Sequence, residues 1–448
     1  MGKFIMSIEK EFLKKSDNNS LVVGIVGLGY VGLPLAEAYA HAGVSVIGYD
    51  ISEERANQLN AGISGMKHIA NSRVQEMLNK RLFRPTHNPQ DLVDADAILI
   101  AVPTPLDIHH QPDLSYVINT CHTLKKHLRR GQLIVLESTT YPGTTEEVMK
   151  PILEGSGLVE GVDFALAYSP EREDPGNPDF ETSTIPKVVG ADTKYARSMA
   201  KAVYDKIVKT VMVSNARTAE ATKLVENIYR WINIAAVNEM KVIFEKMEID
   251  IWEVIDAAKT KPFGFQAFYP GPGVGGHCIR IDPYYLSYKA REHGLSTQFI
   301  DLAGNINTKM PRRIIQRLLE EMSLQKGKSL SGSKVLLCGL AYKKDIDDMR
   351  ESPSLELIHI LKDHGAEVHY YDPIISEVPY MRDHPEFMGL KAIKWSKKEL
   401  ITFDAAVIAT DHTSVDYLEL CKCISLVIDT RNATASVPPK YRNVVVKA

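Results

Sequence analysis

Residues 21–32 of this 448-residue chain read Leu-Val-Val-Gly-Ile-Val-Gly-Leu-Gly-Tyr-Val-Gly. The first half is an apolar run typical of a buried strand, and the second half has the spacing G-x-G-x-x-G. A helical pattern follows over residues 33–42, and a second apolar run over 44–49 ends at Asp50. Strand, glycine turn, helix, strand and acid in this order predict a doubly wound α/β domain.

The same glycine turn predicts a nucleotide cofactor. Glycines permit a tight turn and let a pyrophosphate approach the N-terminus of the following helix. The carboxylate of Asp50 would accept hydrogen bonds from the adenosine ribose and repel a 2′-phosphate, which favours NAD over NADP. Arg55, in the next helix, would reach the adenosine end or remain a solvated surface side chain. The predicted cofactor-binding residues of this stretch are Gly27, Gly29, Tyr30, Val31, Gly32, Asp50 and Arg55.

Three further apolar runs end in polar loops that hold Thr104, Thr139 and Glu171 in turn. Ligands bind at the carboxyl ends of the strands in open α/β sheets, so these three residues are candidates for a site. The alternatives are a turn residue, a helix cap and a solvated acid. The runs span residues 97–102, 132–136 and 164–168.

A long helical pattern without proline or glycine runs over residues 218–247. About 1.5 Å per residue makes it roughly 45 Å long, which suits a spine between two domains. Lys223 and Asn227 lie four residues apart and therefore share one face. Such a pair could stabilise a developing oxyanion, although spacing alone favours a solvent-facing pair.

The loop at residues 270–283 places four glycines and two prolines ahead of Cys278. Asp282 and Pro283 predict the N-cap and first position of a helix. A thiol just before a helix N-terminus can have a lowered pKa and act as a nucleophile. The alternative is a buried structural cysteine beside a capping aspartate.

A second α/β pattern follows a polar linker at residues 325–333. Its first loop is basic instead of glycine-rich, so Lys343 and Arg350 are candidates for phosphate recognition. We therefore expect an α/β protein with two Rossmann-like, doubly wound domains, joined by a long central helix and a helical middle domain.

Composition restricts the class of protein further. The net charge of −3 gives no general attraction to nucleic acid or to an anionic membrane. No apolar run reaches the roughly 18–20 residues of a membrane span, and the first residues lack a signal-peptide core. The five cysteines show no disulfide framework, and Cys421 and Cys423 have no second pair to complete a zinc site. A cytoplasmic protein without a bound metal is expected.

Together these motifs resemble the UDP-glucose/GDP-mannose dehydrogenase family over about residues 21–440. The resemblance implies three domains: an NAD-binding domain at 21–212, a central helical and dimerisation domain with the cysteine loop at 213–325, and a UDP-sugar-binding domain at 326–448. Ahead of them, the N-terminal tail at residues 1–20 mixes apolar and charged residues, which indicates a short helix or a loose chain. A homodimer or larger assembly is also implied. The matching stretches are residues 27–32, 137–139, 169–172, 220–227, 275–278, 339–343 and 350–353.

The resemblance implies a four-electron oxidation of a sugar alcohol to a carboxylate with two NAD⁺. Cys278 would bind the aldehyde covalently, Lys223 and Asn227 would stabilise oxyanions, and Asp282 and Glu171 would serve hydrolysis. The implied catalytic residues are Cys278, Lys223, Asn227, Asp282, Glu171 and Thr139. Thr104, Thr139 and Arg350 would contact the cofactor. The substrate would contact Glu171, Lys223, Asn227, Tyr269, Gly275 and Lys343.

Two features concern the substrate. His277 before the cysteine, and Ile281 where glucose-type relatives usually have lysine, most resemble UDP-N-acetyl-D-glucosamine 6-dehydrogenases. The aromatic loop at 263–269 could receive the acetamido group, and the alternative is that its rings serve only to pack the loop.

Relatives usually have proline where this chain has Arg280. The alternatives are a UDP-glucose or UDP-N-acetyl-D-mannosamine 6-dehydrogenase, or an inactive homologue that only binds the nucleotide sugar.

Overall fold

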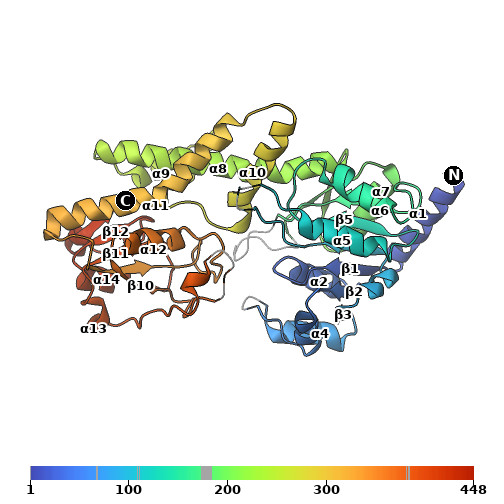
Figure 1. The fold of residues 1–448 in the computed structure, drawn as a ribbon, viewed down its shortest axis with the longest axis horizontal. Helices are drawn as coiled ribbons and strands as arrows, with labels where there is room; N and C mark the ends of the chain where they lie inside the picture. The colour runs from blue at the N-terminus through green and yellow to red at the C-terminus, as the bar shows by residue number, and fades with distance from the viewer. Residues whose placement is uncertain are drawn as a thin grey trace. The chain divides into compact units, whose positions relative to one another are not determined.

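The computed structural model describes residues 2–66, 69–107, 109, 111–172, 184–379, 381 and 384–448, without the side chains of residues 2–7, 277 and 278. The chain divides into two compact units (Figure 1). The first unit comprises Met1–Glu226 and Tyr284–Leu295, and the second comprises Asn227–Pro283 and Ser296–Ala448. Helices α8, Ala216–Lys246, and α10, His277–Glu292, contribute to both units.

The first unit is built on a sheet whose strands stand in the order β3-β2-β1-β4-β5-β6-β7-β8. Strands β6 and β7 pair antiparallel, and the other neighbours in this sheet pair in parallel. The first six strands have the order typical of dinucleotide-binding domains. The strands are β1 Val22–Val26, β2 Ser45–Tyr49, β3 Phe83–Thr86, β4 Ala97–Ile100, β5 Leu133–Leu136, β6 Ala165–Tyr168, β7 Lys187–Gly190 and β8 Thr210–Val213.

Both faces of this sheet are covered. In β4, Ala97 and Leu99 belong to one hydrophobic core, while Ile98 and Ile100 belong to another. A strand buried on both faces needs an unbroken apolar run, which explains why β4 shows no polar alternation. The helices of this unit are α1 Gly2–Asp17, α2 Gly32–His41, α3 Glu53–Asn60, α4 Asn71–Asn79, η1 Pro89–Asp94, α5 Ser115–Lys125, η2 Thr144–Met149, α6 Lys150–Glu154 and α7 Lys194–Tyr204.

The N-terminal residues form helix α1. Phe12 is buried in the first core, and Lys15 Nζ donates to Oδ1 of Asp96 at 2.8 Å. Ser16 Oγ donates to the carbonyl oxygen of Ala202 at 3.3 Å. Of the two alternatives for this stretch, a short helix or a loose chain, the structure has the helix packed on the first unit.

The second unit holds a parallel sheet in the order β10-β9-β11-β12-β13. This is the other common doubly wound order, with its switch point between β9 and β11. The predicted fold class of two Rossmann-like domains with a long helix between them in the chain is therefore confirmed. The strands are β9 Lys334–Cys338, β10 Glu367–Tyr371, β11 Ala405–Ile408, β12 Val427–Asp429 and β13 Val445–Lys447.

Helix α11 packs beside α12 in this unit (Figure 1). Gly327, with φ +59°, ends α11 in the left-handed conformation that closes many helices. None of the helices in the described residues is both long and apolar enough to span a membrane. The further helices are α9 Ile251–Ala258, α11 Gln298–Lys326, α12 Pro353–Asp363, η3 Pro385–Phe387, α13 Lys397–Leu400, α14 Tyr417–Cys423 and η4 Pro439–Val444.

Helix α10 begins earlier than predicted. The sequence pattern placed its N-cap at Asp282, but the helix starts at His277 and contains Pro283 in its interior. Proline is tolerated at a first helical position and disfavoured inside a helix, which is why the pattern was misleading. The carboxylate of Asp282 accepts a hydrogen bond from the side chain of Asn227. Cys278 is thus the second residue of the helix, although its side chain lies outside the described part.

Candidate active site

In the glycine loop after β1, two glycines pack closely against neighbouring backbone and a third leaves its backbone open. A Cβ on Gly27, whose φ is +91°, would lie 2.7 Å from the carbonyl oxygen of Ala101. A Cβ on Gly32 would lie 1.8 Å from the carbonyl oxygen of Gly27. A Cβ on Gly29, in contrast, would meet no heavy atom within 4 Å. Gly27 and Gly32 are therefore required by packing, and the open backbone at Gly29 fits a pyrophosphate above the helix N-terminus.

Asp50 and Arg55 hold this loop in place through hydrogen bonds to its backbone. Oδ2 of Asp50 accepts from the backbone N–H of Leu28 at 2.9 Å, and Oδ1 accepts from that of Ser52 at 3.0 Å. Arg55 donates through Nε and Nη2 to the carbonyl oxygen of Leu28 at 3.1 and 2.9 Å. Its Nη1 donates to the carbonyl oxygen of Ser64 at 2.5 Å. These contacts give Arg55 a structural part, and its contact with adenosine stays a prediction.

Changing Asp50 tests the cofactor preference. Asp50→Ala should raise the KM for NAD⁺ about 10- to 100-fold, because hydrogen bonds to a charged group contribute about 1.5–3 kcal/mol. Asp50→Asn removes the charge and keeps an acceptor for Leu28, so it should chiefly weaken discrimination against NADP⁺. Steady-state kinetics with both cofactors measure these effects. Equal kcat/KM for NAD⁺ and NADP⁺ in the unaltered protein would contradict the role of Asp50.

Lys223 and Thr139 meet in the first unit. Nζ of Lys223 donates to Oγ1 of Thr139 at 2.5 Å, and both side chains are buried. Glu220, one turn earlier on α8, accepts from the backbone N–H of Gly143 at 2.5 Å and from that of Thr145 at 2.9 Å. The loop after β5 is thereby fixed on α8. This anchor brings Lys223 and Thr139 together, a contact that the sequence did not predict.

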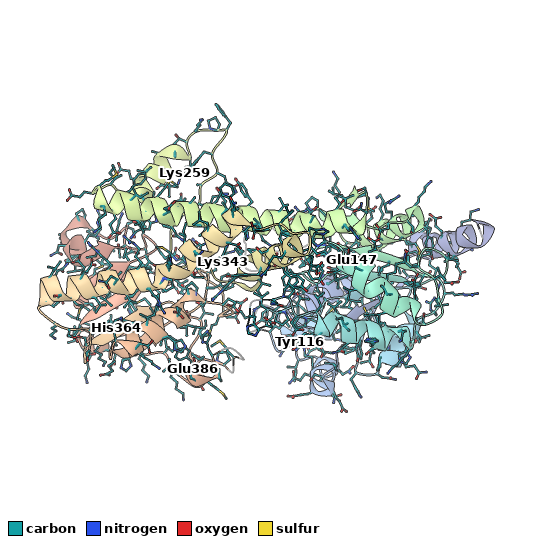
Figure 2. All side chains as sticks on the ribbon, turned by 45° about the horizontal axis from the view of Figure 1, so that its top comes forward. Tyr116, Glu147, Lys259, Lys343, His364 and Glu386 are labelled. Atoms are coloured by element: carbon teal, nitrogen blue, oxygen red, sulfur yellow. The ribbon has the colours of Figure 1, made fainter. Side chains whose placement is uncertain are left out.

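The C-terminal turns of α10 pack on the same edge of the first sheet. Tyr285 donates its hydroxyl to the carbonyl oxygen of Thr104 at 3.1 Å, and its ring centroid lies 6.2 Å from that of Tyr141. Lys289 Nζ lies 2.6 Å from Oε2 of Glu147, which is labelled in Figure 2. The side chain of Thr104 is buried. Thr104 therefore positions α10 through its backbone, and its contact with the cofactor stays a prediction.

Glu171 belongs to a buried ionic network that the sequence did not predict. Lys187, at the start of β7, places Nζ 2.6 Å from Oε2 of Glu137 and 3.0 Å from Oε2 of Glu171. The hydroxyl of Tyr204 donates to the other oxygen of Glu137 at 2.6 Å. Burial alone would lower the pKa of Lys187, but the two carboxylates outweigh it and raise that pKa. Lys187 therefore stays charged and fixes Glu171.

In the second unit, Asn227 and Asp282 are paired. Nδ2 of Asn227 donates to Oδ2 of Asp282 at 2.5 Å, and both side chains are buried. Lys223 precedes Asn227 by one turn of α8, so the two predicted oxyanion-binding groups do follow each other along one helix. Cys278 precedes Asp282 by four residues on α10.

The glycines ahead of Cys278 pack against the loop after β9. A Cβ on Gly275 would lie 2.5 Å from the Cβ of Tyr342, and one on Gly276 would lie 3.0 Å from the Tyr342 ring. The backbone N–H of Gly276 donates to the carbonyl oxygen of Arg350 at 3.2 Å. Only glycine fits where two backbone segments approach so closely. The cysteine loop and the basic loop of the second domain are thus in contact.

Arg280, the departure from the family pattern, has an acidic partner. Its Nη1 lies 3.0 Å from Oε2 of Glu351 in the second unit, and both side chains are partly exposed. The pair ties the first turn of α10 to the loop before α12. Exposed ion pairs contribute about 0–1 kcal/mol, so the pair adds little stability. The carboxylate of Glu351 nevertheless balances the positive charge of Arg280.

The basic loop carries its predicted phosphate-binding residues on a turn before α12. Nη2 of Arg350 lies 2.6 Å from Oδ2 of Asp348, and the arginine side chain is 44% exposed. Lys343 lies in the same loop, directly after Tyr342. Its position is marked in Figure 2. Their roles in phosphate recognition stay predictions.

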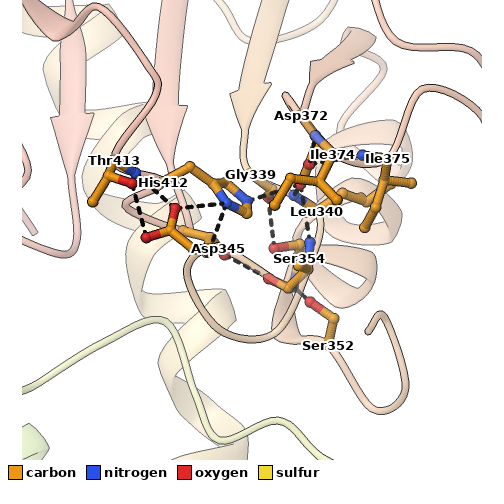
Figure 3. Close-up of polar contacts among 12 residues, drawn as sticks. Gly339, Leu340, Asp345, Ser352, Ser354, Asp372, Ile374, Ile375, His412 and Thr413 are labelled. Atoms are coloured by element: carbon orange, nitrogen blue, oxygen red, sulfur yellow. Dashed lines mark hydrogen bonds and ion pairs between the residues drawn. The ribbon is translucent and has the colours of Figure 1, made fainter. Parts of the chain in front are cut away.

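A buried histidine and aspartate support this loop (Figure 3). Asp372, at the end of β10, accepts from the backbone N–H of Leu340 at 2.7 Å and from Nε2 of His412 at 3.0 Å. Nδ1 of His412 accepts from the backbone N–H of Asp345 at 3.0 Å. Burial would raise the pKa of Asp372, but the hydrogen bonds from His412 and the backbone outweigh it and lower that pKa. Asp372 occupies the place of Asp50 in the first domain.

The remaining predicted residues have simple places. Val31 is the N-cap of α2, and Tyr30 is 43% exposed beside the glycine loop. Tyr269 is also exposed, and its hydroxyl donates to Oδ1 of Asp256 at 2.8 Å. Sequence reasoning missed Lys187, Glu137 and His412, and His412 had no motif around it that could have revealed it.

The glycine loop after β1 of a Rossmann-like sheet, followed along the chain by a second Rossmann-like domain, defines a dinucleotide-dependent oxidoreductase. The chain belongs to the UDP-glucose/GDP-mannose dehydrogenase family. The NAD binding domain of the family matches residues 21–208, the central domain matches 217–309, and the UDP binding domain matches 336–436. By class it is an NAD-dependent UDP-sugar dehydrogenase.

Similar proteins cover nearly the whole chain. UDP-N-acetyl-D-glucosamine 6-dehydrogenase of Pseudomonas aeruginosa is 36% identical over 81% of this chain and 85% of its own. UDP-N-acetyl-D-mannosamine dehydrogenase of Pyrococcus horikoshii is 35% identical over 93% and 96%. A solved structure of the UDP-D-ManNAc dehydrogenase from Pyrococcus horikoshii has a TM-score of 0.83 and 34% identity, covering 94% of this chain and 97% of its own.

Proposed function

We propose that this enzyme oxidises the primary alcohol of a UDP-N-acetylhexosamine, most simply UDP-N-acetyl-D-glucosamine, to the uronic acid. The observation that carries the proposal is the similarity, over more than four-fifths of the chain, to relatives named for N-acetylhexosamine substrates. UDP-N-acetyl-D-mannosamine is the second candidate, because the solved structure with TM-score 0.83 is named for it.

The second unit offers groups suited to an acetamido sugar. Phe263, Phe265 and Tyr269 expose their rings on one loop. Ile281, which replaces the lysine of glucose-type relatives, is buried and adds no charge to a pocket. Apolar faces can receive the acetamido methyl, and loop amides can bind its carbonyl. The Arg280–Glu351 pair supports an active enzyme over an inactive homologue, since the extra positive charge has a partner.

The chemistry follows from the residues at hand. Bound NAD⁺ supplies the hydride acceptor for both oxidations. Lys223 and Asn227 donate hydrogen bonds to the alkoxide oxygen as each hydride leaves. The thiolate of Cys278 adds to the aldehyde carbon and gives a thiohemiacetal, whose oxidation leaves a thioester. Water, oriented by Asp282 and Glu171, attacks the thioester carbon and expels the thiolate, which yields the carboxylate.

The proposed assembly is a homodimer formed about α8. Several apolar side chains on this helix are exposed, and a surface with that many apolar groups often marks an interface. Association through α8 would bury them in a symmetric contact. The exposed side chains are Val225, Tyr229, Met240 and Ile243.

Initial rates with three UDP-sugars test the substrate. UDP-N-acetyl-D-glucosamine should give the highest kcat/KM, and UDP-glucose should be roughly 100-fold or more poorer, because its binding leaves amide-binding groups unpaired. A higher value for UDP-N-acetyl-D-mannosamine would replace the glucosamine assignment with its epimer. If UDP-glucose matched or exceeded both, the N-acetylhexosamine proposal would be wrong.

A further inference from the structure

His359, His384 and Glu386 face one another in the second unit, and none of them has a part in the proposed oxidation. Nε2 of His359 lies 3.4 Å from Nδ1 of His384 and 2.7 Å from Oε1 of Glu386. Nδ1 of His384 lies 3.3 Å from the same oxygen. In the described part of the chain, this is the one group of three or more His, Cys, Asp or Glu whose ligand atoms all lie within 4.8 Å.

The backbone and a buried ring hold these side chains in place. His359 lies on α12, whereas His384 is the N-cap of η3 and Glu386 lies within η3. Phe387, buried in the core, has its ring centroid 4.6 Å from that of His359 and 5.8 Å from that of His384. Packing therefore orients both imidazoles without occupying the nitrogens that face each other.

We propose that these three side chains form a binding site for a divalent transition-metal ion of the Zn²⁺ type. An ion bound tetrahedrally at about 2.0–2.1 Å from each ligand separates its ligands by about 3.3 Å. Two of the three observed separations, 3.4 and 3.3 Å, match that spacing. The third, 2.7 Å, needs only a small opening between His359 and Glu386.

The ligand set selects the ion. Two imidazoles and one carboxylate suit Zn²⁺, Co²⁺ and their neighbours, whereas Mg²⁺ and Ca²⁺ prefer oxygen ligands throughout. Three protein ligands leave a fourth position for water. The side chains of His359, His384 and Glu386 are 37%, 29% and 45% exposed, so an ion can enter from solvent. Figure 2 shows Glu386 at the surface of its unit.

One neighbouring charge opposes the site. Lys362, three residues after His359 on α12, places Nζ 5.0 Å from the centroid of the Phe387 ring. Its positive charge reduces the affinity for a cation, and solvent at the half-exposed cluster screens that repulsion. The competing arrangement is a hydrogen-bonded cluster in which the two imidazoles donate to Glu386 and no metal binds. A metal site and a metal-free cluster can be distinguished by measuring whether Zn²⁺ binds and whether its binding requires all three side chains.

Calorimetric titration of the full-length enzyme with Zn²⁺ tests the site. All proteins carry Cys278→Ser, so that the predicted catalytic thiol does not compete for the metal. His359→Gln, His384→Gln and Glu386→Gln should each weaken Zn²⁺ binding by more than the roughly 10- to 100-fold that loss of an outer-shell partner costs. Titration with Co²⁺ should give visible ligand-field bands that these three variants lose.

His369→Gln is the matched control. Nε2 of His369 lies 2.7 Å from Oε1 of Glu367, the same kind of pair, but no described third ligand joins it. This variant should bind Zn²⁺ as its parent does. Should His359→Gln fail to fold, Glu386→Gln changes the most exposed of the three ligands and tests the site alone. Equal affinity in the parent and the three ligand variants, or an equal loss in His369→Gln, would overturn the proposal.

Discussion

Replacing Cys278 with serine should slow complete oxidation of the UDP-sugar by a factor on the order of 10³ or more, the scale on which loss of a nucleophile acts. A serine hydroxyl ionises far less readily than a thiol, and an oxygen ester hydrolyses more slowly than a thioester. The unaltered enzyme should form two NADH for each sugar consumed. In Cys278→Ser, NADH formed should approach one per sugar, and an aldehyde-trapping reagent should capture the product of the first oxidation.

Cys423 provides the control for this variant. It is a partly buried free thiol on α14, and burial raises its pKa. Cys423→Ser should therefore keep both the rate and the stoichiometry of two NADH. A stoichiometry of one in the unaltered enzyme, or full turnover by Cys278→Ser, would exclude the covalent mechanism while leaving the sugar assignment open.

The sequence predicted several of the strands that are buried on both faces, among them β1 and β4. β1 and β4 are runs of apolar residues bounded by turns, and such runs can be recognised locally. β3 and β7 were missed. β3 is four residues long and contains Pro85, and β7 begins with Lys187. Both are strands only because a neighbouring strand pairs with them, and neither local sequence predicts that pairing.

Among the functional residues, too, those with a local sequence signal were predictable and those placed by tertiary contacts were not. Gly27 and Asp50 were predictable because their spacing reflects one local turn and one strand end. The start of α10 was not, because Pro283 has the same sequence signature at a first helical position as it has inside this helix. His359 and Glu386 lie 27 residues apart on α12 and η3, a separation that matches no metal-binding motif. Tertiary packing alone brings them together.

Replacing Lys187 with methionine should reduce both stability and activity. The change keeps the apolar length of the side chain and removes the charge that faces Glu137 and Glu171. Breaking a buried ion pair on one side costs about 3–5 kcal/mol. Without its cation, Glu171 should no longer be held for hydrolysis, so kcat should fall more than KM rises.

The loss of stability should depend on pH with a definite sign. Burial already raises the pKa of Glu137, although Lys187 and Tyr204 oppose that shift. In Lys187→Met the opposing charge is gone, so the pKa should rise further above that of the unfolded chain. A carboxyl group with a raised folded pKa stabilises the fold below its unfolded pKa, about 4.3, and this contribution is lost as the pH rises. Urea unfolding should therefore show a larger deficit at pH 8 than at pH 5.

A double variant separates the two effects of Lys187. Lys187→Met with Glu137→Gln removes both charges of the buried pair, and removing both partners of a buried interaction costs far less than removing one. The double variant should regain most of the free energy of unfolding at pH 8. Its kcat should stay low, because Glu171 still lacks the ammonium group that lies 3.0 Å away in the native protein. A free energy of unfolding that is equal in Lys187→Met and the unaltered enzyme at both pH values would show that Lys187 does not neutralise these carboxylates.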